Sequence, residues 1–561
     1  MEEALSCNFN GEQVNDGDST IAYLYESAAY GSSCISQSRT CNNGTLSGSY
    51  TFESCYVEAA ATCSFNGKII THGDNVLAYQ AATAPFGSSC NSQNRNCNNG
   101  SLSGSYSSES CIVESKIGWP QQIGTTESDL AYSIFIDSSD NVFITGSTKG
   151  DLLGKVNTGN EDIFIIKFSE YGELINSNLI NSKRFTSTKT GESLTIVPSD
   201  IGYGILVNDN NDLFLTGQSD GFFSDPTEMI LDATYQNYSV SPSGYYTLKY
   251  HHQNDGFTVK IDENGDEIWA RQTHEFSNCC NLQQNQNGKD LALDTDGNLI
   301  VYGDIQAYVF DGKISIGDFH DDIYLLKFDI NGEKIWSARG GTSFSLRAGG
   351  MITDSDDNIY VSFNAGYYGS SYGGFAKYDN NGNLKWMRTK INSFSNGTYG
   401  SLGFRDIAVD SEGKIYVVGS TSGSFDDNRN IGNFDFLIFK TESGNINWSQ
   451  QIGSTSYDLA SAIVIDKDDN IYITGRSEGS FDGNQQIGSS DIILAKFNTD
   501  GEKQWALQIG TTQEDYAEDI AVDSKGNVYI TGWTAGNLYG IKNVGNSDIF
   551  VLKFDSDGNL Q

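Results

Sequence analysis

Cysteines are the residues in this 561-residue chain whose type and spacing most directly predict chemistry. Eight of the ten form two sets of four, the second set displaced from the first by 56 residues: Cys7, Cys34, Cys41, Cys55, Cys63, Cys90, Cys97 and Cys111. Asn-Gly pairs follow Cys41 and Cys97 and predict hairpin turns. So short a segment buries too little apolar surface to fold alone, and cross-links compensate. We therefore predict two small disulfide-stapled β modules.

The pairing within each module stays open, because four cysteines allow three connectivities. Zinc is the competing interpretation, but no C-x-x-C pair occurs and His72 has no counterpart in the first module. Disulfides instead indicate an oxidising compartment. The other two cysteines, Cys279 and Cys280, are adjacent in a long connection, and we predict a vicinal disulfide between them.

Tyrosines and histidines gather in two segments that could bind a ligand. They are Tyr235, Tyr238, Tyr245, Tyr246, Tyr250, His251 and His252 in one segment, and Tyr367, Tyr368 and Tyr372 in the other. Tyr beside Gly and Ser is typical of recognition loops, and aromatic rings stack on sugar faces. The alternative for each Tyr is packing of the insertion against its own sheet. The histidines could bind a transition metal, but without fixed spacing they are typical of polar surface.

Acidic turns raise the question of calcium, for which Asp294, Asp296, Asp466 and Asp468 are the candidate ligands. A helix–loop–helix calcium site needs Gly at the sixth position of its loop and a bidentate acid at the twelfth. Counting from Asp294, Gly297 is fourth, and a strand-like run follows it. A tight hairpin turn explains Asp, Gly and Asn without metal. We predict turns here, and calcium is the one cofactor that the sequence leaves open.

Composition and motifs restrict the function classes. The chain has 72 acidic and 34 basic side chains, a net charge of −38, which excludes sequence-independent nucleic-acid binding and disfavours anionic membranes. No nucleophile elbow, H-E-x-x-H or phosphate loop is present, so we predict no catalytic residues. No run is long enough to insert into a membrane. No signal peptide is recognisable. The cysteines nevertheless suggest export, so we expect a leader to precede this sequence.

Seven copies of one pattern must position these residues. The inner runs of the copies end at Asp137, Asn208, Asp294, Asp354, Asp410, Asp466 and Asp523. Each copy holds about four short β-rich runs separated by turn residues, which is typical of a four-stranded blade. The last copy stops at Gln561, before its Trp, and the missing piece stands at 119–124. A repeat divided in this way predicts a ring closed by its N-terminal strand.

One copy shows a resemblance to a known family. Residues 458–475 read D-x-A-x-x-I-x-x-D-x-x-x-N-x-Y-I-T-G, and 491–497 read D-I-x-x-x-K-F. These phrases resemble the bacterial β-propeller repeat called SBBP, over roughly 117–561. The resemblance implies exported or surface proteins without an established common activity. We predict an all-β chain with modules at 1–58 and 59–115 and a seven-bladed β-propeller of four-stranded antiparallel blades at 116–561.

Propeller topology separates the connections between strands onto two faces. Connections from strand two to three, and from strand four to the next blade, open on what we call the long-loop face. The one-to-two and three-to-four turns open on the short-turn face. The length variation falls in the first set, at 176–199, 218–254, 272–289, 303–321 and 363–374. Function commonly sits on variable loops held by a rigid scaffold.

These patterns predict an exported, non-enzymatic recognition or adhesion protein, extracellular or at the cell surface. It would bind a glycan or protein surface through the long-loop face, with the cysteine modules as a stalk. One alternative is a structural subunit or tip of a surface fibre, assembling through those modules. Another is a polysaccharide-acting hydrolase or lyase with its site in the central funnel of the propeller.

Overall fold

The computed structural model of the chain describes residues 5–84, 89–113, 118–182, 185–189, 192–196, 198–221, 223, 238–240, 246–248, 255–262, 265–273, 286–306, 309–310, 313–314, 321–367, 370–390, 400–426 and 428–561. Contacts divide the chain into two compact units, Met1–Glu114 and Ser115–Gln561. Regular structure in the described residues is β-strand, apart from two single 3-10 turns, η1 (Phe481–Gly483) and η2 (Leu538–Gly540). No helix in the described part of the chain is long and apolar enough to cross a membrane.

The first unit contains the two cysteine modules, which have the same order of short strands. Those of the first module are β1 (Cys7–Phe9), β2 (Glu12–Val14), β3 (Ser19–Tyr23), β4 (Ser27–Ala28), β5 (Ser36–Asn42), β6 (Thr45–Leu46) and β7 (Tyr56–Val57). Those of the second are β8 (Cys63–Phe65), β9 (Lys68–Ile70), β10 (Asn75–Tyr79), β11 (Thr83–Ala84), β12 (Ser92–Asn98), β13 (Ser101–Leu102) and β14 (Ile112–Val113).

Four disulfides hold the modules and resolve the pairing that the sequence left open. The bonds are Cys7–Cys41, Cys34–Cys55, Cys63–Cys97 and Cys90–Cys111. Cys7 and Cys41 are buried with Phe9, Val14 and Ala22, a core of only a few side chains. So small a core supports the expectation that cross-links supply much of the stability.

His72 has a structural role between the modules. Its Nδ1 accepts a hydrogen bond from the backbone N–H of Asn99 at 3.0 Å, so its neutral form carries the proton on Nε2. Nε2 lies 2.7 Å from the hydroxyl of Tyr30 in the first module. In the first module Asp16 takes the place of His72 and accepts from the N–H of Asn43.

The second unit contains, within the described residues, seven four-stranded antiparallel sheets of the kind that form propeller blades. Sheet 1 is β16 (Asp129–Ile136), β17 (Val142–Thr148), β18 (Asp162–Phe168) and β19 (Leu174–Ile180); sheet 2 is β22 (Asp200–Val207), β23 (Leu213–Ser219), β26 (Asp255–Ile261) and β27 (Glu267–Thr273). Sheet 3 is β28 (Gln286–Leu293), β29 (Leu299–Ile305), β32 (Asp322–Phe328) and β33 (Lys334–Gly340); sheet 4 is β34 (Ser345–Thr353), β35 (Ile359–Tyr367), β36 (Ser370–Tyr378) and β37 (Leu384–Lys390). Sheet 5 is β38 (Leu402–Val409), β39 (Ile415–Thr421), β40 (Asp435–Glu442) and β41 (Asn445–Ile452); sheet 6 is β42 (Asp458–Ile465), β43 (Ile471–Ser477), β44 (Asp491–Phe497) and β45 (Lys503–Ile509). Sheet 7 is β46 (Asp515–Val522), β47 (Val528–Thr534), β48 (Asp548–Phe554) and β15 (Gln121–Ile123).

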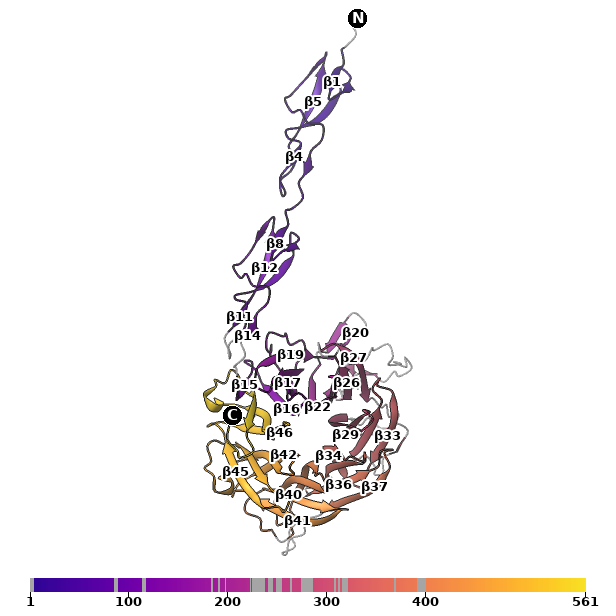
Figure 1. Cartoon of the computed structure of the whole chain (residues 1–561). Coiled ribbons are helices and arrows are strands. Elements are labelled where there is room, and N and C mark those ends of the chain that lie inside the picture. The colour runs from indigo at the N-terminus through magenta and orange to yellow at the C-terminus, as the bar shows by residue number, and fades with distance from the viewer. Residues whose placement is uncertain are drawn as a thin grey trace. The chain divides into compact units, whose positions relative to one another are not determined.

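The sheets lie around a common centre, with first strands such as β16, β34 and β42 innermost and fourth strands such as β37 and β45 on the rim (Figure 1). The prediction that 119–124 supplies the missing strand is confirmed, because β15 pairs with β48 as the outer strand of sheet 7. Sheet 7 also contacts sheet 1, where Asp140 accepts hydrogen bonds from the backbone N–H and the hydroxyl of Ser524.

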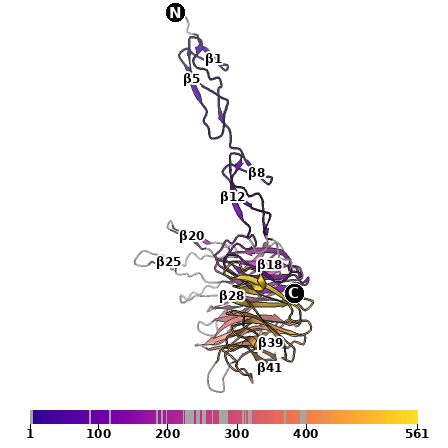
Figure 2. The ribbon, with the colours of Figure 1, turned by 90° about the vertical axis from the view of Figure 1, so that its left-hand side faces the viewer.

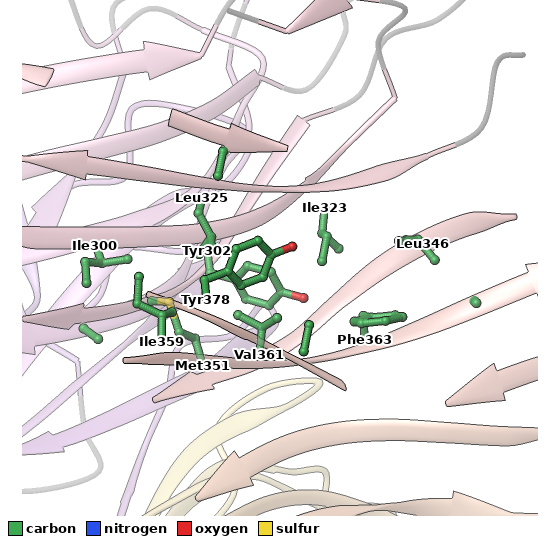
Figure 3. Packing of buried hydrophobic residues seen from close by; sticks show 14 residues of the cluster. Ile300, Tyr302, Ile323, Leu325, Leu346, Met351, Ile359, Val361, Phe363 and Tyr378 are labelled. Atoms are coloured by element: carbon green, nitrogen blue, oxygen red, sulfur yellow. The ribbon is translucent and has the colours of Figure 1, made fainter. Parts of the chain in front are cut away.

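The core lies between neighbouring sheets. Between sheets 3 and 4, Tyr302 and Tyr378 lie side by side among aliphatic residues that include Leu325, Ile359 and Val361 (Figure 3). The hydroxyl of Tyr302 donates to the carbonyl oxygen of Ser362 on the next sheet at 2.7 Å. Because both faces of these sheets are covered, the second strand of each sheet is buried along most of its length.

Three partly buried aspartates join neighbouring sheets near the centre. Asp519 accepts from the backbone N–H of Ile134, which connects sheet 7 to sheet 1. Asp290 likewise joins sheet 3 to sheet 4 through Met351, and Asp406 joins sheet 5 to sheet 6 through Ile463.

The extra strands that the structure describes in this unit all lie in connections of the long-loop set, as predicted. They are the hairpins β20 (Phe185–Lys189) with β21 (Glu192–Ile196), β24 (Tyr238–Val240) with β25 (Tyr246–Leu248), and β30 (Val309–Phe310) with β31 (Lys313–Ile314). Seen edge-on, β20 and β25 lie on one side of the sheets (Figure 2). The interpretation of 363–374 as a loop is wrong for most of its length, because cross-strand hydrogen bonding continues from β35 into β36 up to the pair Tyr367–Ser370.

Candidate functional site

The signature residues of the repeat form a lattice at the short-turn ends of the sheets. In sheet 3, Lys327 pairs with Asp294 of the first turn, Nζ to Oδ2 at 2.5 Å, and both side chains are buried. Lys327 lies opposite Trp336 in the strand register. The Trp336 indole donates to the carbonyl oxygen of Asn380, in the turn of the next sheet, at 3.0 Å. The same indole-to-carbonyl contact is made by Trp119, Trp269 and Trp448. These motif residues therefore hold sheets together.

The four calcium candidates lie in this lattice. Asp294 accepts from the backbone N–H groups of Asp296 and Asn298, in addition to its ion pair with Lys327. Asp466 accepts equivalent bonds from Asp468 and Asn470. Asp296 and Asp468 are exposed. Within the described residues no group of three or more acidic, Cys or His side chains could hold a metal ion. These contacts agree with the hairpin-turn interpretation.

A hollow at the short-turn face is lined by aspartates of the same turns. It is lined by Asp354, Asp410, Asp466 and Asp469 among others, at the ends of the inner strands of sheets 4, 5 and 6. Their carboxylates accept from turn amides or hydroxyls, as Asp469 does from Ser411. Because these acceptors are engaged, the hollow provides little that a polar ligand could bind.

In the long-loop half of the inner strands, the side chains vary from sheet to sheet, unlike the repeated residues at the short-turn ends. The variable side chains lie at a β-bulge in each first strand. The register of each first strand shifts at one point, after Ala131, Gly202, Gly288, Ala348, Phe404, Ala460 and Ala517. A bulge inserts one or more unpaired residues and re-aims a side chain. The bulge residues are Tyr132, Tyr203, Lys289, Gly349 with Gly350, Arg405, Ser461 and Glu518, so the side chains differ among almost all sheets.

These side chains influence one another electrostatically across the centre of the sheets. Arg405 of sheet 5 acts electrostatically on Lys289 of sheet 3 and on Glu518 of sheet 7, and Glu518 also acts on Tyr203 of sheet 2. Sheets 3 and 5 are not neighbours, and neither are sheets 5 and 7, so these influences act across the centre. We call Tyr132, Tyr203, Lys289, Arg347, Arg405, Arg476, Tyr516, Glu518 and Trp533 the axial cluster.

Four successive sheets supply the cations of the cluster. Lys289, Arg347, Arg405 and Arg476 come from sheets 3, 4, 5 and 6. Arg347 and Arg405 are exposed, and their guanidinium groups form no hydrogen bond or ion pair with the described residues. The Nε atom of Arg476 is buried without a hydrogen-bond partner among the described residues, as are the Oδ1 atoms of Asn287 and Asn364. At the short-turn ends Lys260, Lys327 and Lys440 are paired with aspartates, whereas the guanidinium groups of Arg347 and Arg405 are not.

Aromatic rings occupy the rest of the cluster. Tyr516 lies between the guanidinium of Arg476, 3.9 Å from its ring centroid, and Trp533, whose ring stacks on it at 4.1 Å. In sheets 1 to 3, the ring centroids of Tyr132 and Tyr203 are 5.3 Å apart, and the Lys289 ammonium lies 3.6 Å from the Tyr203 centroid. Cation–π contacts of this kind fix the positions of cationic groups while leaving their hydrogen-bond donors unused.

Burial dominates the electrostatics of the cluster. It lowers the pKa of Lys289, an effect opposed by Asp304 and reinforced by Arg405 and Arg347. It raises the pKa of Glu518 against the influence of Arg405, Arg476 and Trp533, and raises the pKa of Tyr203 to about 12. Near the cluster, burial raises the pKa of Asp290 to about 7 and that of Asp519 to about 6. All these shifts favour the neutral forms, because burial disfavours charge.

The ligand-binding residues predicted from sequence have other positions. Tyr372 lies in β36, opposite Ala365, and packs against Phe344 with ring centroids 5.7 Å apart. Tyr238, Tyr246 and Tyr367 lie in strands β24, β25 and β35. The other predicted ligand-binding residues lie outside the described residues: Tyr235, Tyr245, Tyr250, His251, His252 and Tyr368. The predicted vicinal disulfide partners, Cys279 and Cys280, also lie outside them.

Sequence reasoning missed the axial cluster, although the repeat carried a signal for it. Side chains of different kinds stand between similar neighbours, as in Ala131-Tyr132-Ser133 and Ala517-Glu518-Asp519, where a small residue precedes and an apolar run follows. When the seven copies are lined up, this position varies among Tyr, Lys, Arg, Ser, Gly and Glu, while the residue before it is Ala or Gly in six of the seven copies. A varying position within a constant frame indicates a side chain that the fold does not fix.

Comparison with known proteins supports the fold. The family model described as "Beta-propeller repeat", SBBP, matches residues 118–154, 399–426, 447–482 and 504–540. The chain therefore carries SBBP β-propeller repeats at four places. Most of the matches begin on the outer strand of one sheet and end after the second strand of the next, so the repeat unit spans the boundary between two sheets.

Curated relatives are distant. The regulatory protein FlaEY of Caulobacter vibrioides is 25% identical over 183 residues, which is 29% of this chain and 19% of that protein. An uncharacterized WD repeat-containing protein of Acanthamoeba polyphaga mimivirus is 20% identical over 470 residues, covering 74% of this chain and 30% of that protein. The chain thus spans less than a third of the length of these two relatives.

Solved structures that match this chain include proteins of different kinds. A puromycin hydrolase matches with a TM-score of 0.43 and 9% identity over 79% of this chain and 55% of that one. The polysaccharide lyase Uly1 matches with a TM-score of 0.39 and 10% identity over 77% of this chain and 92% of that one. A protein of unknown function from Dyadobacter fermentans matches with a TM-score of 0.37 and 11% identity over 78% of this chain and 98% of that one.

Proposed function

We propose that the seven sheets form a closed seven-bladed propeller that serves as an exported, non-enzymatic recognition protein. It would bind a glycan or protein surface through the long-loop face, with the cysteine modules as a stalk. The observation that carries this proposal is the difference between the two faces. The insertions and the unpaired side chains belong to the long-loop half, whereas the short-turn half repeats one structural lattice.

The disulfides support export, because such bonds persist in oxidising compartments. The hairpin insertions support recognition, because they add surface to connections that the blades do not need for closure. The absence of the usual catalytic motifs from the sequence favours binding over turnover.

Glycan-array and pull-down binding test the proposal. Replacing 234–252 and 366–373 with short Gly/Ser segments should abolish binding of whatever ligand the intact chain retains. The replacement of 366–373 also removes paired residues of β35 and β36, so the thermal midpoint of the variant is measured to separate loss of binding from loss of folding. Retention of full binding by this variant would count against recognition through the long-loop face.

An enzyme acting on polysaccharides is the second candidate, and one feature of the axial cluster favours it. The Lys289 amine is held against Tyr203, and burial lowers its pKa. An amine whose pKa is lowered gives up its proton more readily and can then act as a base. Release of new reducing or unsaturated sugar ends from a polysaccharide would decide for this candidate, and loss of that release in Lys289→Met would place the reaction in the cluster.

A further inference from the structure

We propose that the axial cluster binds a carboxylate-bearing sugar, a uronate residue of an acidic polysaccharide, at the centre of the long-loop face. This inference rests on the proposed function and names its ligand class. It is carried by three features of the described residues: unpaired cations, buried polar atoms without partners, and aromatic rings, all on the long-loop half of the first and second strands.

The cations define the charge of the ligand. Arg347 and Arg405 form no ion pair with the described residues, although the chain has more than twice as many acidic as basic groups. Lys289 feels the repulsion of both guanidinium groups. An anion placed among them would relieve that repulsion and would accept the donors of a planar guanidinium in a bidentate manner, which suits a carboxylate.

The neighbouring acids limit the anion to one of low charge. Glu518 and Asp304 lie near the same cations, and burial raises the pKa of each. The neighbouring cations act to lower the pKa of both acids, so part of the cationic charge is already engaged, which suits the single charge of a uronate carboxylate better than a phosphate or sulfate cluster. The mixed set of acids and bases also suits sugar hydroxyls, which both donate and accept hydrogen bonds.

The unpartnered polar atoms and the rings favour a sugar over an acidic peptide. Asn287 Oδ1 and Asn364 Oδ1 can accept from hydroxyls, and Arg476 Nε can donate to a ring or hydroxyl oxygen. These atoms come from three different sheets, so a compact ligand with polar groups around its edge satisfies them better than one extended side chain. The cluster also supplies aromatic surface for the apolar face of a pyranose ring, from Tyr132, Tyr203 and Trp533.

Polygalacturonate, with dextran as a neutral polymer and poly-L-glutamate as an acidic peptide, provides the test. Titration calorimetry on the full chain should show binding of polygalacturonate that weakens with added salt, and little binding of the other two polymers. Arg405→Gln should weaken it about tenfold to a hundredfold, the effect of losing one charge-assisted hydrogen-bonded contact. Lys467→Gln is the matched control: it removes one positive charge on the short-turn face and should leave binding unchanged.

Three results would overturn the inference: no binding of polygalacturonate, equal binding of poly-L-glutamate, or binding that Arg405→Gln leaves intact. The proposed function fails separately. If the Gly/Ser replacement of 234–252 and 366–373 leaves polygalacturonate binding intact while Arg405→Gln abolishes it, the axial site stands and recognition by the insertions fails. If the intact chain binds other glycans or proteins through its insertions but not polygalacturonate, the reverse holds.

Discussion

The residues at the two ends of the blade strands differ in how much they vary between sheets. At the short-turn end, nearly every sheet repeats an Asp in the first turn, a Lys on the third strand and a Trp on the fourth. In sheets 3 and 5 the Lys pairs with the Asp, and the Trp336 indole donates to the next sheet. At the long-loop end, the equivalent bulge positions hold Tyr, Lys, Gly, Arg, Ser or Glu, and Arg405 among them has no partner in the described residues. Both ends belong to one β framework, so the difference lies in what each end is required to do.

The comparison teaches that repetition marks where this fold gains stability and variation marks where it is free to bind. A buried ion pair contributes to stability only when both partners are present, so it cannot vary at one partner alone. An exposed arginine with no partner contributes little to stability and can be changed without unfolding the chain.

The largest expected effect comes from breaking the short-turn lattice. Lys327→Met leaves the buried Asp294 carboxylate without its ion pair, and we expect the free energy of unfolding to fall by about 3–5 kcal/mol. Urea denaturation measures it. Lys467→Met is the control, because its ion pair with Asp468 is exposed and its loss should change stability far less. Equal losses in the two variants would contradict the structural role of the lattice.

The second effect is a pH dependence of stability, set by aspartates in the first strands of sheets 2, 3 and 7. The folded-state pKa of Asp290 is raised to about 7, and those of Asp519 and Asp200 to about 6. The folded state therefore holds these protons more tightly than the unfolded state does. The free energy of unfolding should rise as pH falls from about 7.5 to about 5.

Asp290→Asn removes one of these titrating groups, so it should flatten that rise by up to about 1.4 kcal/mol per pH unit near neutrality. Asp296→Asn removes the same charge from an exposed turn and should keep the full slope. Urea midpoints of the three proteins across this pH range check the prediction. Identical slopes for Asp290→Asn and the unaltered chain would show that Asp290 is not the titrating group.

The third effect is a gain in stability where the lattice is incomplete. Asn176 stands opposite Lys167, where most other sheets have Trp, and a hollow lined by Phe143, Ile165 and Asn176 among others is found there. Asn176→Trp should fill it and raise the free energy of unfolding by about 1–2 kcal/mol. Ile175→Trp, at an exposed neighbouring position, is the control and should change little. A loss of stability in Asn176→Trp would mean that the hollow cannot accept the ring.

The smallest expected effect is on the stability of an axial-cluster variant. Arg405 is exposed and unpaired within the described residues, so Arg405→Gln should change the free energy of unfolding by no more than about 0.5 kcal/mol. The measurement is the same urea denaturation as for Lys327→Met. A loss comparable to that of Lys327→Met would mean that the cluster is structural, and the contrast between the two ends would fail.

Much of the fold could be predicted from the sequence because it is repeated. Asp466, Asn470 and Tyr472 recur at fixed spacing, and the structure shows them hydrogen-bonded to one another in a turn and strand. The divided repeat correctly predicted that β15 completes sheet 7. Disulfide pairing could not be predicted, because cysteine spacing is compatible with three connectivities and only the folded strands bring Cys7 to Cys41.

The candidate site was less accessible to sequence reasoning. Tyr372 was interpreted as part of a Gly-rich recognition loop, yet it lies in a strand against Phe344, because hydrogen bonding along β35 and β36 extends beyond the length of the other blade strands. The axial cluster was missed because its members come from different copies of the repeat, far apart in the chain, and lie in short strands with ordinary patterns.

The sequence by itself determined the β framework, its division into similar sheets and the small cysteine modules, since local turn chemistry and repeated packing contacts suffice for these. Only the tertiary structure decided which side chains meet at the centre. Each inner strand contributes a bulge, and the arrangement of the sheets brings Lys289, Arg405 and Glu518 within electrostatic range of one another. Proximity of that kind comes from the arrangement of whole sheets, which no local pattern records.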